Sequence, residues 1–239
     1  MKSISISLYN RPEYTARLFD HLNNCIGVDE YNFIICVEPV NSDVINLAKS
    51  FRPAQSSLTI NEDKLGCQTN IFQSVAKGFE INTGFHIHLE DDTIPGKDCL
   101  KYFEWAAEKY KDDQSVFSVS GYVNSNNLME NCCNSKTDDI MLVDRRKHFT
   151  PWGWGTWLSR WKEIRKDWDF GYNNGGWDVN MAKRLRQDRY EIYPMVSRIQ
   201  NIGAKDGIHV ESEEWHKKNH FNEYWIESMN KYTEDFYER

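Results

Sequence analysis

The sequence predicts an α/β protein whose mostly parallel central sheet is flanked by helices, and three observations support this fold class. Over residues 1–95, short apolar segments alternate with segments whose apolar residues recur every three or four positions. That alternation is typical of strands that alternate with helices. The apolar run at 33–37 is continuous, as expected for a strand covered on both faces. Another apolar-biased run, at 85–89, ends in three consecutive carboxylates.

The first half of the chain is expected to follow the order β-α-β-α-β-α-β. Residues 3–8 alternate between serine and apolar side chains, which indicates a strand. Pro12 suits the first turn of a helix, and the apolar residues after it recur at helical spacing. The expected strands are 3–8, 32–37, 57–60 and 85–89, and the expected helices are 12–22, 44–51 and 69–81. Helices that connect consecutive strands in this way predict parallel strand pairing.

The second half is less regular. Its expected helices are 99–110, 156–166 and 177–187, and its expected strands are 116–120, 140–143 and 191–197. The polar segment 124–139 is too long for a plain connection. Residues 152–155 contain two glycines, which predicts a turn or loop. Apolar residues spaced three and four apart within 211–239 predict an amphipathic helix, interpreted as a lid against the core.

Composition narrows the class of protein. A chain of 239 residues suits one α/β domain, or one domain with a small appendage. The net charge of −7 argues against a nucleic-acid surface. Aromatic residues make up 14% of the chain, and six of its nine tryptophans lie within 152–177. Because tryptophan rings serve cores, interfaces and sugar-stacking sites alike, this density is only a hint of a carbohydrate site.

The sequence also bears on the cellular compartment. No segment approaches the ~20 apolar residues of a membrane helix, and the first residues lack the apolar core of a signal peptide. The six cysteines show no CxxC spacing and no histidine pattern for zinc, so we expect them to be reduced. These features predict a cytoplasmic protein, and peripheral association with the inner face of the membrane is left open.

Glu90, Asp91 and Asp92 form the most informative motif. A strand cannot bury three adjacent anions without counter-ions, so these side chains must lie at or just past the end of strand 85–89. Ligands of open α/β sheets bind outside the carboxyl ends of the strands. Clustered carboxylate oxygens suit Mg²⁺ or Mn²⁺, and such an ion suits a diphosphate. The alternative is a solvated acidic turn.

The order of the motifs resembles that of the GT-A glycosyltransferases, in particular the inverting enzymes of the N-acetylglucosaminyltransferase I type and their bacterial relatives. The resemblance spans roughly residues 3–210. Its most specific points are Glu90-Asp91-Asp92, the loop 149–157, the pair Trp177-Asp178, and the segments Ser197-Arg198-Ile199 and Gly207-Ile208-His209. It implies a GT-A domain at 1–210, made of a nucleotide-binding half (1–95) and an acceptor half (96–210), followed by a C-terminal helical extension at 211–239.

The resemblance places the nucleotide sugar on residues of the first half. The family's acidic motif falls on the triplet, whose last acid, Asp92, would ligate a Mn²⁺ or Mg²⁺ ion that bridges the diphosphate. Glu90 would hold the sugar or ribose, with Asp91 in the same donor site. Arg11, in the turn after the first strand, would contact the diphosphate, and its alternative is a surface charge. Glu38 would lie near the base or ribose, although the family often has Asp there.

In the second half, the resemblance makes Asp178 the general base and its neighbour Trp177 an acceptor-binding residue. An Asp at this position also suits a helix cap, and Asp206 is the alternative base. His209 falls where the family often has a second metal ligand, although a lone histidine is more often structural. Each of these roles therefore has a structural alternative.

Two further pairs of residues have two interpretations each. Trp154 and Gly155 would line the sugar pocket, because glycine lets the backbone approach a ligand closely. Their alternative is a place in the core. His86 and His88 share one face of their strand and are interpreted as packing residues.

Together these expectations describe an inverting glycosyltransferase that moves a hexosyl or N-acetylhexosaminyl group from a nucleotide sugar, with a UDP-sugar favoured. The acceptor would be a hydroxyl of a glycan or glycolipid, as in a cell-surface glycan precursor. One alternative is a sugar nucleotidyltransferase, although Asn10-Arg11-Pro12 lacks the glycine-rich basic loop that such enzymes use. The other is a non-catalytic carbohydrate-binding module, which is commonly an all-β sandwich.

Overall fold

The computed structural model describes residues 1–53, 55–124, 139–205, 210–220, 225–226 and 233–238. Its centre is a nine-stranded mixed sheet. In spatial order the strands are β11 (Tyr237–Glu238), β7 (Leu142–Arg146), β9 (Tyr190–Pro194), β6 (Val116–Ser120), β8 (Trp154–Trp157), β4 (Phe85–Glu90), β1 (Lys2–Leu8), β2 (Tyr31–Val37) and β3 (Gln55–Ile60). The strands β4, β1, β2 and β3 are mutually parallel, whereas β8 runs antiparallel to both of its neighbours. The predicted α/β fold class is confirmed.

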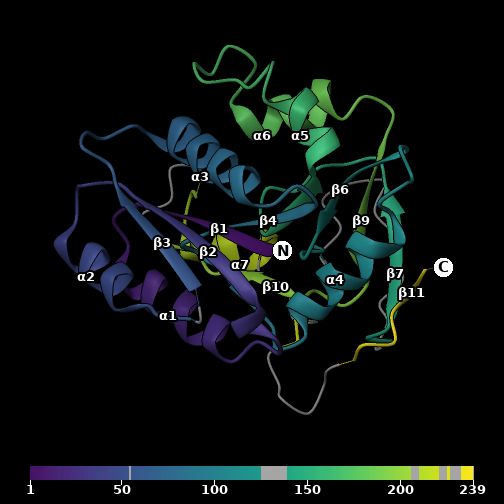
Figure 1. Cartoon of the computed structure of the whole chain (residues 1–239), viewed down its shortest axis with the longest axis horizontal. Coiled ribbons are helices and arrows are strands. Elements are labelled where there is room, and N and C mark those ends of the chain that lie inside the picture. The colour runs from purple at the N-terminus through teal and green to yellow at the C-terminus, as the bar shows by residue number, and fades with distance from the viewer. Residues whose placement is uncertain (54, 125–138, 206–209, 221–224, 227–232, 239) are drawn as a thin grey trace.

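Helices cover both faces of the sheet (Figure 1). On one face lie α1 (Pro12–Asn23), α2 (Ser42–Ser50) and α4 (Cys99–Lys109), and on the other lie α3 (Cys67–Ile81), α5 (Leu158–Ile164) and α6 (Trp177–Asn180). The alternation in β1 explains this division, because Ile4, Ile6 and Leu8 join the core beneath α1 and α2. The serines between them face α3.

The helices and strands of the first half lie within two residues of their predicted bounds.

Three predictions for the second half differ from the structure. Residues 152–155 were expected to form a loop, but Trp154 and Gly155 begin β8, which lies between β4 and β6. Glycine is required there, because a Cβ at Gly155 would lie 2.4 Å from the ring of Phe85. The helix expected at 177–187 is shorter: α6 leads directly into a π-helical segment, Met181–Leu185.

The third correction concerns residues 211–239, which do not form one amphipathic helix. Their described part contains a short helix, α7 (Glu213–Asn219), and the strand β11, which pairs with β7 at the edge of the main sheet. Phe236 packs into the same core as α4 and β6. Among the described residues of this region, Phe236 and Ile226 are thus buried without belonging to a helix. No described helix is both long and apolar enough to span a bilayer.

A second, two-stranded sheet lies beside the end of β4. In it β5 (Thr93–Pro95), which follows the acidic triplet directly, pairs antiparallel with β10 (Ile199–Asn201). The amide of Ile202 then donates to the carbonyl of Asp92 over 2.8 Å. These bonds fix the chain on both sides of the last acid.

The α3 face of β1 and β4 is polar although it is buried. His86 and His88 alternate with Ile87 and Leu89 along β4, and both rings are hydrogen-bonded to serines of β1. Burial lowers the pKa of each histidine from 6.5 to about 3, and the charge of His86 adds to the effect on His88. Both rings are consequently neutral at physiological pH, in agreement with their interpretation as packing residues.

This burial predicts a pH-dependent stability. Between pH 6.5 and about 3 the unfolded chain binds one proton more per histidine than the folded chain, so lowering the pH favours unfolding. The stabilisation is complete above pH 6.5 and is lost as the pH falls towards 3. We expect His88→Gln to reduce the slope of unfolding free energy against pH by about 1.4 kcal/mol per unit, between about pH 6 and about pH 4. Denaturant titrations at several pH values measure that slope, and an unchanged slope would contradict a neutral His88.

Candidate functional site

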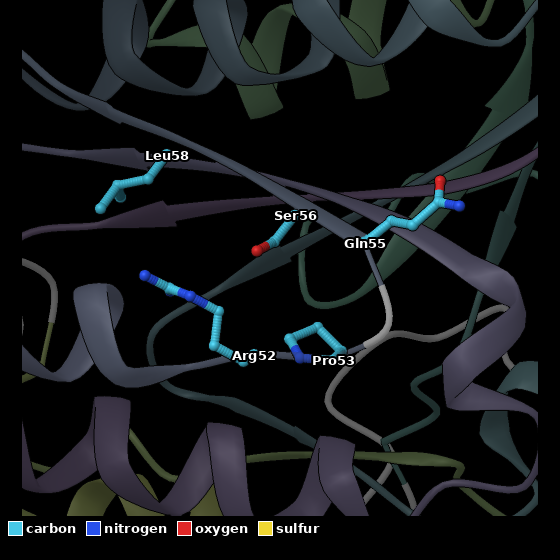
Figure 2. Close-up of a pocket in the computed structure, with 5 residues that line it drawn as sticks. All are labelled: Arg52, Pro53, Gln55, Ser56 and Leu58. Atoms are coloured by element: carbon cyan, nitrogen blue, oxygen red, sulfur yellow. The ribbon is translucent and has the colours of Figure 1, made fainter.

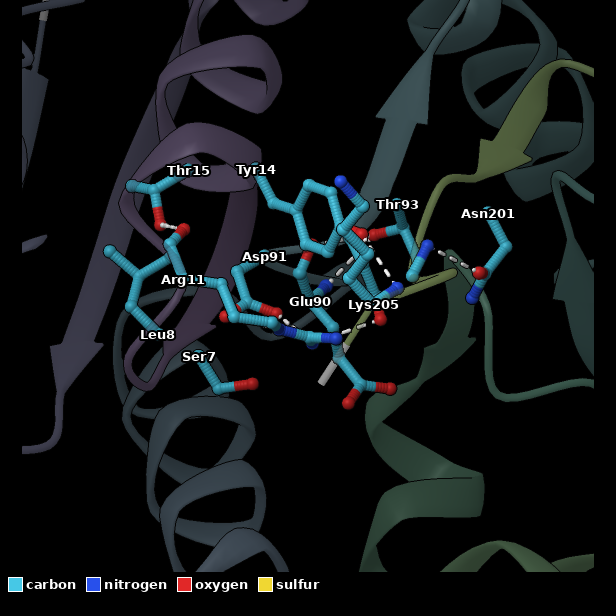
Figure 3. Close-up of polar contacts among 12 residues, drawn as sticks. Ser7, Leu8, Arg11, Tyr14, Thr15, Glu90, Asp91, Thr93, Asn201 and Lys205 are labelled. Carbon is cyan, nitrogen blue, oxygen red and sulfur yellow. Dashed lines mark hydrogen bonds and ion pairs between the residues drawn. The ribbon is translucent and has the colours of Figure 1, made fainter. Parts of the chain in front are cut away.

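The acidic triplet lies at the carboxyl ends of β1 and β4. The register of the two strands places Ser7 opposite Glu90, and the chain after β1 turns so that Arg11 precedes α1. Figure 3 shows the Arg11 side chain extending across Asp91, with Ser7 beside it. The structure therefore brings together Arg11 and the three acids that the sequence predicted as neighbours of a diphosphate.

Arg11 is shared between two of the acids. Its Nη2 donates to Oδ1 of Asp91 and lies 2.9 Å from Oδ2 of Asp92, and its Nε donates to Oδ2 of Asp91 over 3.3 Å. Burial alone would lower the pKa of Arg11, but the charges of Asp92 and Asp91 outweigh burial and raise it. The guanidinium is thus held as a cation within the cluster, and its interpretation as a free surface charge is wrong.

One guanidinium does not compensate three carboxylates. Burial raises the pKa of Glu90 well above its usual value, and the charges of Asp92 and Asp91 raise it further. Burial also raises the pKa of Asp91 to about 6, against the lowering effect of Arg11. Three ionised carboxylates against one guanidinium would leave an excess of negative charge, and the raised pKa values show that this charge is unfavourable without a further cation.

The chemistry of these donors fits Mg²⁺ or Mn²⁺. Both ions prefer carboxylate oxygens, and Mg²⁺ is commonly held by one or two carboxylates together with substrate phosphates. Within the described ranges no three His, Cys, Asp or Glu side chains converge on one point. An ion bound at Asp92, whose side chain is 13% exposed, would accordingly share its coordination sphere with phosphate oxygens.

A turn after β10 supports Asp92, and no local pattern in the sequence indicates this contact. A Cβ at Gly203 would lie 2.3 Å from Oδ2 of Asp92 and 3.3 Å from Nη1 of Arg11, so a larger residue would displace one of these side chains. The amide of Gly203 donates to Oδ1 of Asn201, which also lies 2.9 Å from Nε2 of His216 in α7. Asn201 and His216 therefore hold the backbone against which the Asp92 carboxylate rests.

Glu38 is buried at the end of β2, and its carboxylate is already engaged. Oε1 accepts the amide of Gly66 over 2.7 Å, and Oε2 accepts the amide of Leu65 over 2.9 Å. Asn61 donates to the same carboxylate over 3.4 Å. In this structure Glu38 orders the loop before α3, so any contact with a base or ribose would be made through that loop.

Asp178 is the second residue of α6 and does not cap it. Its carboxylate makes no hydrogen bond or ion pair with the described part of the chain, so the capping alternative is not supported. Its charge contributes to the raised pKa of Glu90, after burial and the nearer acids, so the two carboxylates interact electrostatically. An unengaged carboxylate in this position can accept a proton.

Two residues that the sequence analysis missed position the start of α6. Oε1 of Gln68, in the first turn of α3, accepts the amide of Trp177 over 2.8 Å, and its backbone carbonyl accepts Nε1 of Trp168. The carboxylate of Asp169 accepts three amides of the preceding loop, those of Asn173, Asn174 and Gly176. The Gln68 contacts join segments 100 and 109 residues apart, so no local pattern could indicate them. The Asp169 contacts span only four to seven residues, and the Asn and Gly residues that follow this Asp are a signal of such a turn.

The predicted aromatic site residues belong to the core. Trp154 is 1% exposed and Trp177 is 4% exposed. The ring of Trp177 stacks on Trp168 with centroids 5.2 Å apart, and Trp154 packs against it and against Phe149. Both rings fill the space beneath α3, and Gly155 lies within the sheet, as expected from their alternative place in the core.

The predicted metal ligand His209 and the alternative base Asp206 lie outside the described residues.

The surface hollow in Figure 2 is lined by Arg52, Pro53, Gln55, Ser56 and Leu58. It lies at the amino end of the edge strand β3, whereas the acids lie at the carboxyl ends of the strands. We therefore assign the candidate site to the acids and not to the hollow.

The fold is that of the GT-A glycosyltransferases. The sequence matches the GNT-I family over residues 78–230, more than half of the chain, and the protein belongs to that family. The resemblance of the sequence to GT-A glycosyltransferases is thereby confirmed. No curated protein matches the chain.

Solved structures agree with the fold assignment. The mannosyltransferase PcManGT from Pyrobaculum calidifontis, in complex with GDP-Man and Mn²⁺, has 12% sequence identity and a TM-score of 0.53, over 82% of this chain and 57% of that one. TarS from S. aureus, in complex with UDP-GlcNAc, has 12% identity and a TM-score of 0.57, over 83% and 57%. This chain therefore spans little more than half the length of these similar structures.

The contact between Gly203 and Asp92 predicts a selective loss of metal binding. Gly203→Ala must displace the Asp92 carboxylate or Arg11. We expect Mn²⁺-dependent binding of a nucleoside diphosphate to weaken roughly 10- to 100-fold, the usual cost of losing support around a metal ligand. Isothermal titration calorimetry measures the binding. Gly171→Ala is a matched control, because its nearest neighbours belong to the Asn173 side chain in an exposed loop. Equal affinities of both variants would contradict the assignment of Asp92.

Proposed function

We propose that this protein transfers a sugar from a nucleotide-sugar donor to an acceptor hydroxyl, with inversion at the anomeric carbon and with a divalent metal ion. One observation carries the proposal. At the carboxyl ends of β1 and β4 three carboxylates share one guanidinium, and they interact electrostatically with the carboxylate of Asp178, which makes no hydrogen bond or ion pair with the described residues. The first feature suits a cation with a diphosphate, and the second suits a base.

The donor would bind at the acidic cluster. Asp92 would hold the ion, and Glu90 and Asp91 would complete the polar wall on the sugar side. When bound, the ion supplies positive charge that neutralises the leaving diphosphate. Because Asp91 takes both of the hydrogen bonds that Arg11 donates here, the guanidinium can remain on Asp91 and turn its Asp92 contact towards a phosphate oxygen.

Asp178 would act as the general base. An inverting transfer is a single displacement, in which the acceptor oxygen attacks the anomeric carbon as its proton passes to one carboxylate. No second protein acid is needed once the charge of the leaving diphosphate is neutralised. Gln68 and Asp169 hold the start of α6 and would act as positioning residues for this carboxylate.

The donor and acceptor follow from the family and not from the site. The similar structures contain GDP-Man and UDP-GlcNAc, so the fold serves more than one base and sugar. We favour a UDP-sugar carrying a hexosyl or N-acetylhexosaminyl group, from the resemblance to the N-acetylglucosaminyltransferase I type. The acceptor would be a hydroxyl of a glycan or glycolipid precursor of the cell surface.

The two alternatives are less well supported. A carbohydrate-binding module would commonly be an all-β sandwich with exposed rings, whereas this sheet is flanked by helices and its tryptophans at 154 and 177 are buried. A sugar nucleotidyltransferase would produce inorganic pyrophosphate from a nucleoside triphosphate and a sugar phosphate. Pyrophosphate release under those conditions, without release of nucleoside diphosphate from a nucleotide sugar, would favour that alternative.

The metal role predicts a specific defect. Asp92→Ala should abolish Mn²⁺-dependent protection of the protein against thermal unfolding by a nucleotide sugar, because the carboxylate that holds the ion is lost. The melting temperature without ligand should remain close to that of the parent. Asp112→Ala, which removes an exposed acid in the turn after α4, is the control. Undiminished protection in Asp92→Ala would show that the ion binds elsewhere.

The base role predicts a loss of rate without a loss of binding. Asp178→Asn keeps the size of the side chain but accepts a proton poorly, so kcat should fall by at least roughly a hundredfold while donor affinity is retained. Asp188→Asn, which changes an exposed acid paired with Lys147, is the control. NMR of the product should show the opposite anomeric configuration to the donor. A retained configuration would contradict the single displacement, and an unchanged kcat would remove Asp178 as the base.

A further inference from the structure

A continuous line of buried polar side chains runs along β1 and β4 towards the candidate site. The register of the two parallel strands pairs Ser3 with His86, Ser5 with His88 and Ser7 with Glu90. Both histidine rings and the first two serines are at most 2% exposed. The line ends at Ser7, whose exposed fraction of 8% is the largest along it. The proposed reaction gives no role to these groups.

Successive members of the line are within hydrogen-bond distance. Oγ of Ser3 lies 2.7 Å from Nδ1 of His86, and Nε2 of the same ring lies 2.8 Å from Oγ of Ser5. Oγ of Ser5 lies 2.9 Å from Nδ1 of His88, whose Nε2 lies 3.4 Å from Oγ of Ser7. Each imidazole therefore bridges two hydroxyl groups.

Asn82, at the far end of the line, sets the direction of these bonds. Its Oδ1 accepts the amide of Gly84 over 2.9 Å, so the amide group of Asn82 has a defined orientation. Its Nδ2 donates to the carbonyl of Phe85 and, over 2.8 Å, to Oγ of Ser3. Ser3 thus receives a hydrogen bond from a group that can only donate.

The hydroxyl of Ser3 must then donate to His86. If His86 donated instead, the Ser3 hydroxyl would accept twice and its own proton would have no acceptor in a buried place. With Nδ1 accepting, Nε2 of His86 carries the proton and donates to Ser5. Ser5 in turn donates to Nδ1 of His88, since its other acceptor, the carbonyl of Ile87, is 3.5 Å away.

His88, at the end of the line, follows the same pattern as His86: it accepts a hydrogen bond at Nδ1 and donates one from Nε2. Nε2 of His88 carries the proton and donates to Oγ of Ser7, which leaves the Ser7 proton directed away from the ring. The neighbouring Ser74 does not compete for Nδ1 of His88, because it donates to the carbonyl of Ile71 over 2.9 Å and lies 3.5 Å from the ring. Figure 3 shows Ser7 next to Arg11 and Asp91, at the acidic cluster.

We propose that Ser7 is a hydrogen-bond donor to an oxygen of the bound nucleotide sugar, and that the bonds from Asn82 through both histidines fix its proton in that direction. The inference rests on the proposed function for the identity of the ligand. The direction of the bonds rests on the structure alone. His86 and His88 are positioning residues, because they act on the ligand only through Ser7.

The direction of the bonds is tested by ¹⁵N NMR of the histidine side chains in the unliganded protein. We expect both rings to be neutral with the proton on Nε2. In Asn82→Asp the carboxylate can only accept, so Ser3 would turn towards it and His86 would move its proton to Nδ1. A wild-type ring with its proton on Nδ1 at either position overturns the proposal, and this result needs no variant to fold.

The role of Ser7 is tested by calorimetry with Mn²⁺ and a nucleotide sugar that the wild type binds. Ser7→Ala should weaken binding roughly 3- to 10-fold, the range for one neutral hydrogen bond, and Ser7→Thr should restore most of it. Ser118→Ala is the matched control, because Ser118 is also buried in a strand and its hydroxyl has no partner among the described residues. Equal affinity of Ser7→Ala and wild type overturns the inference. If the wild type binds no nucleotide sugar at all, the proposed function itself fails.

Discussion

The concentration of negative charge after β4 is the constraint on which the rest of the site depends. Three adjacent carboxylates cannot stay together at the end of a buried strand without cations and a fixed backbone. Arg11 supplies one cation from the turn after β1. Asn201 and Gly203 supply the backbone, because the second sheet brings them against Asp92. The remaining excess charge is the physical reason to expect a divalent ion with a phosphate ligand.

Helix α3 links this charged cluster to the proposed base. At its start, the loop held by Glu38 ties it to the end of β2, and Gln68 in its first turn accepts the amide of Trp177. The buried rings beneath α3 then fix α6 against the sheet. Because α3 packs on β1, β2 and β4, one helix positions both the acidic cluster and Asp178. A disturbance of the Glu38 loop should consequently affect both sides.

Much of the fold was predictable because its signals are local. The alternation in β1 and the continuous run in β2 were interpreted correctly as strands, and β4 ends at the acids as predicted. Gly155 was misinterpreted because its requirement comes from Phe85, which lies on another strand. The tryptophans were uncertain for a related reason, since burial depends on which elements meet. No pattern in the sequence indicated the roles of Gln68, Asn201 and His216, because each role depends on a contact with a residue that the fold brings near.

The polar face of β1 shows how a local pattern can have a distant consequence. An alternating strand normally buries one face and exposes the other to water, but here α3 covers the serine face as well. Burying these hydroxyls and imidazoles is unfavourable unless each finds a partner, so the pairing of serines with histidines must be nearly complete. A complete set of partners leaves few choices for each proton. The order imposed by Asn82 therefore extends along the strands to their carboxyl ends, where the last hydroxyl faces the charged cluster and has its proton still to donate.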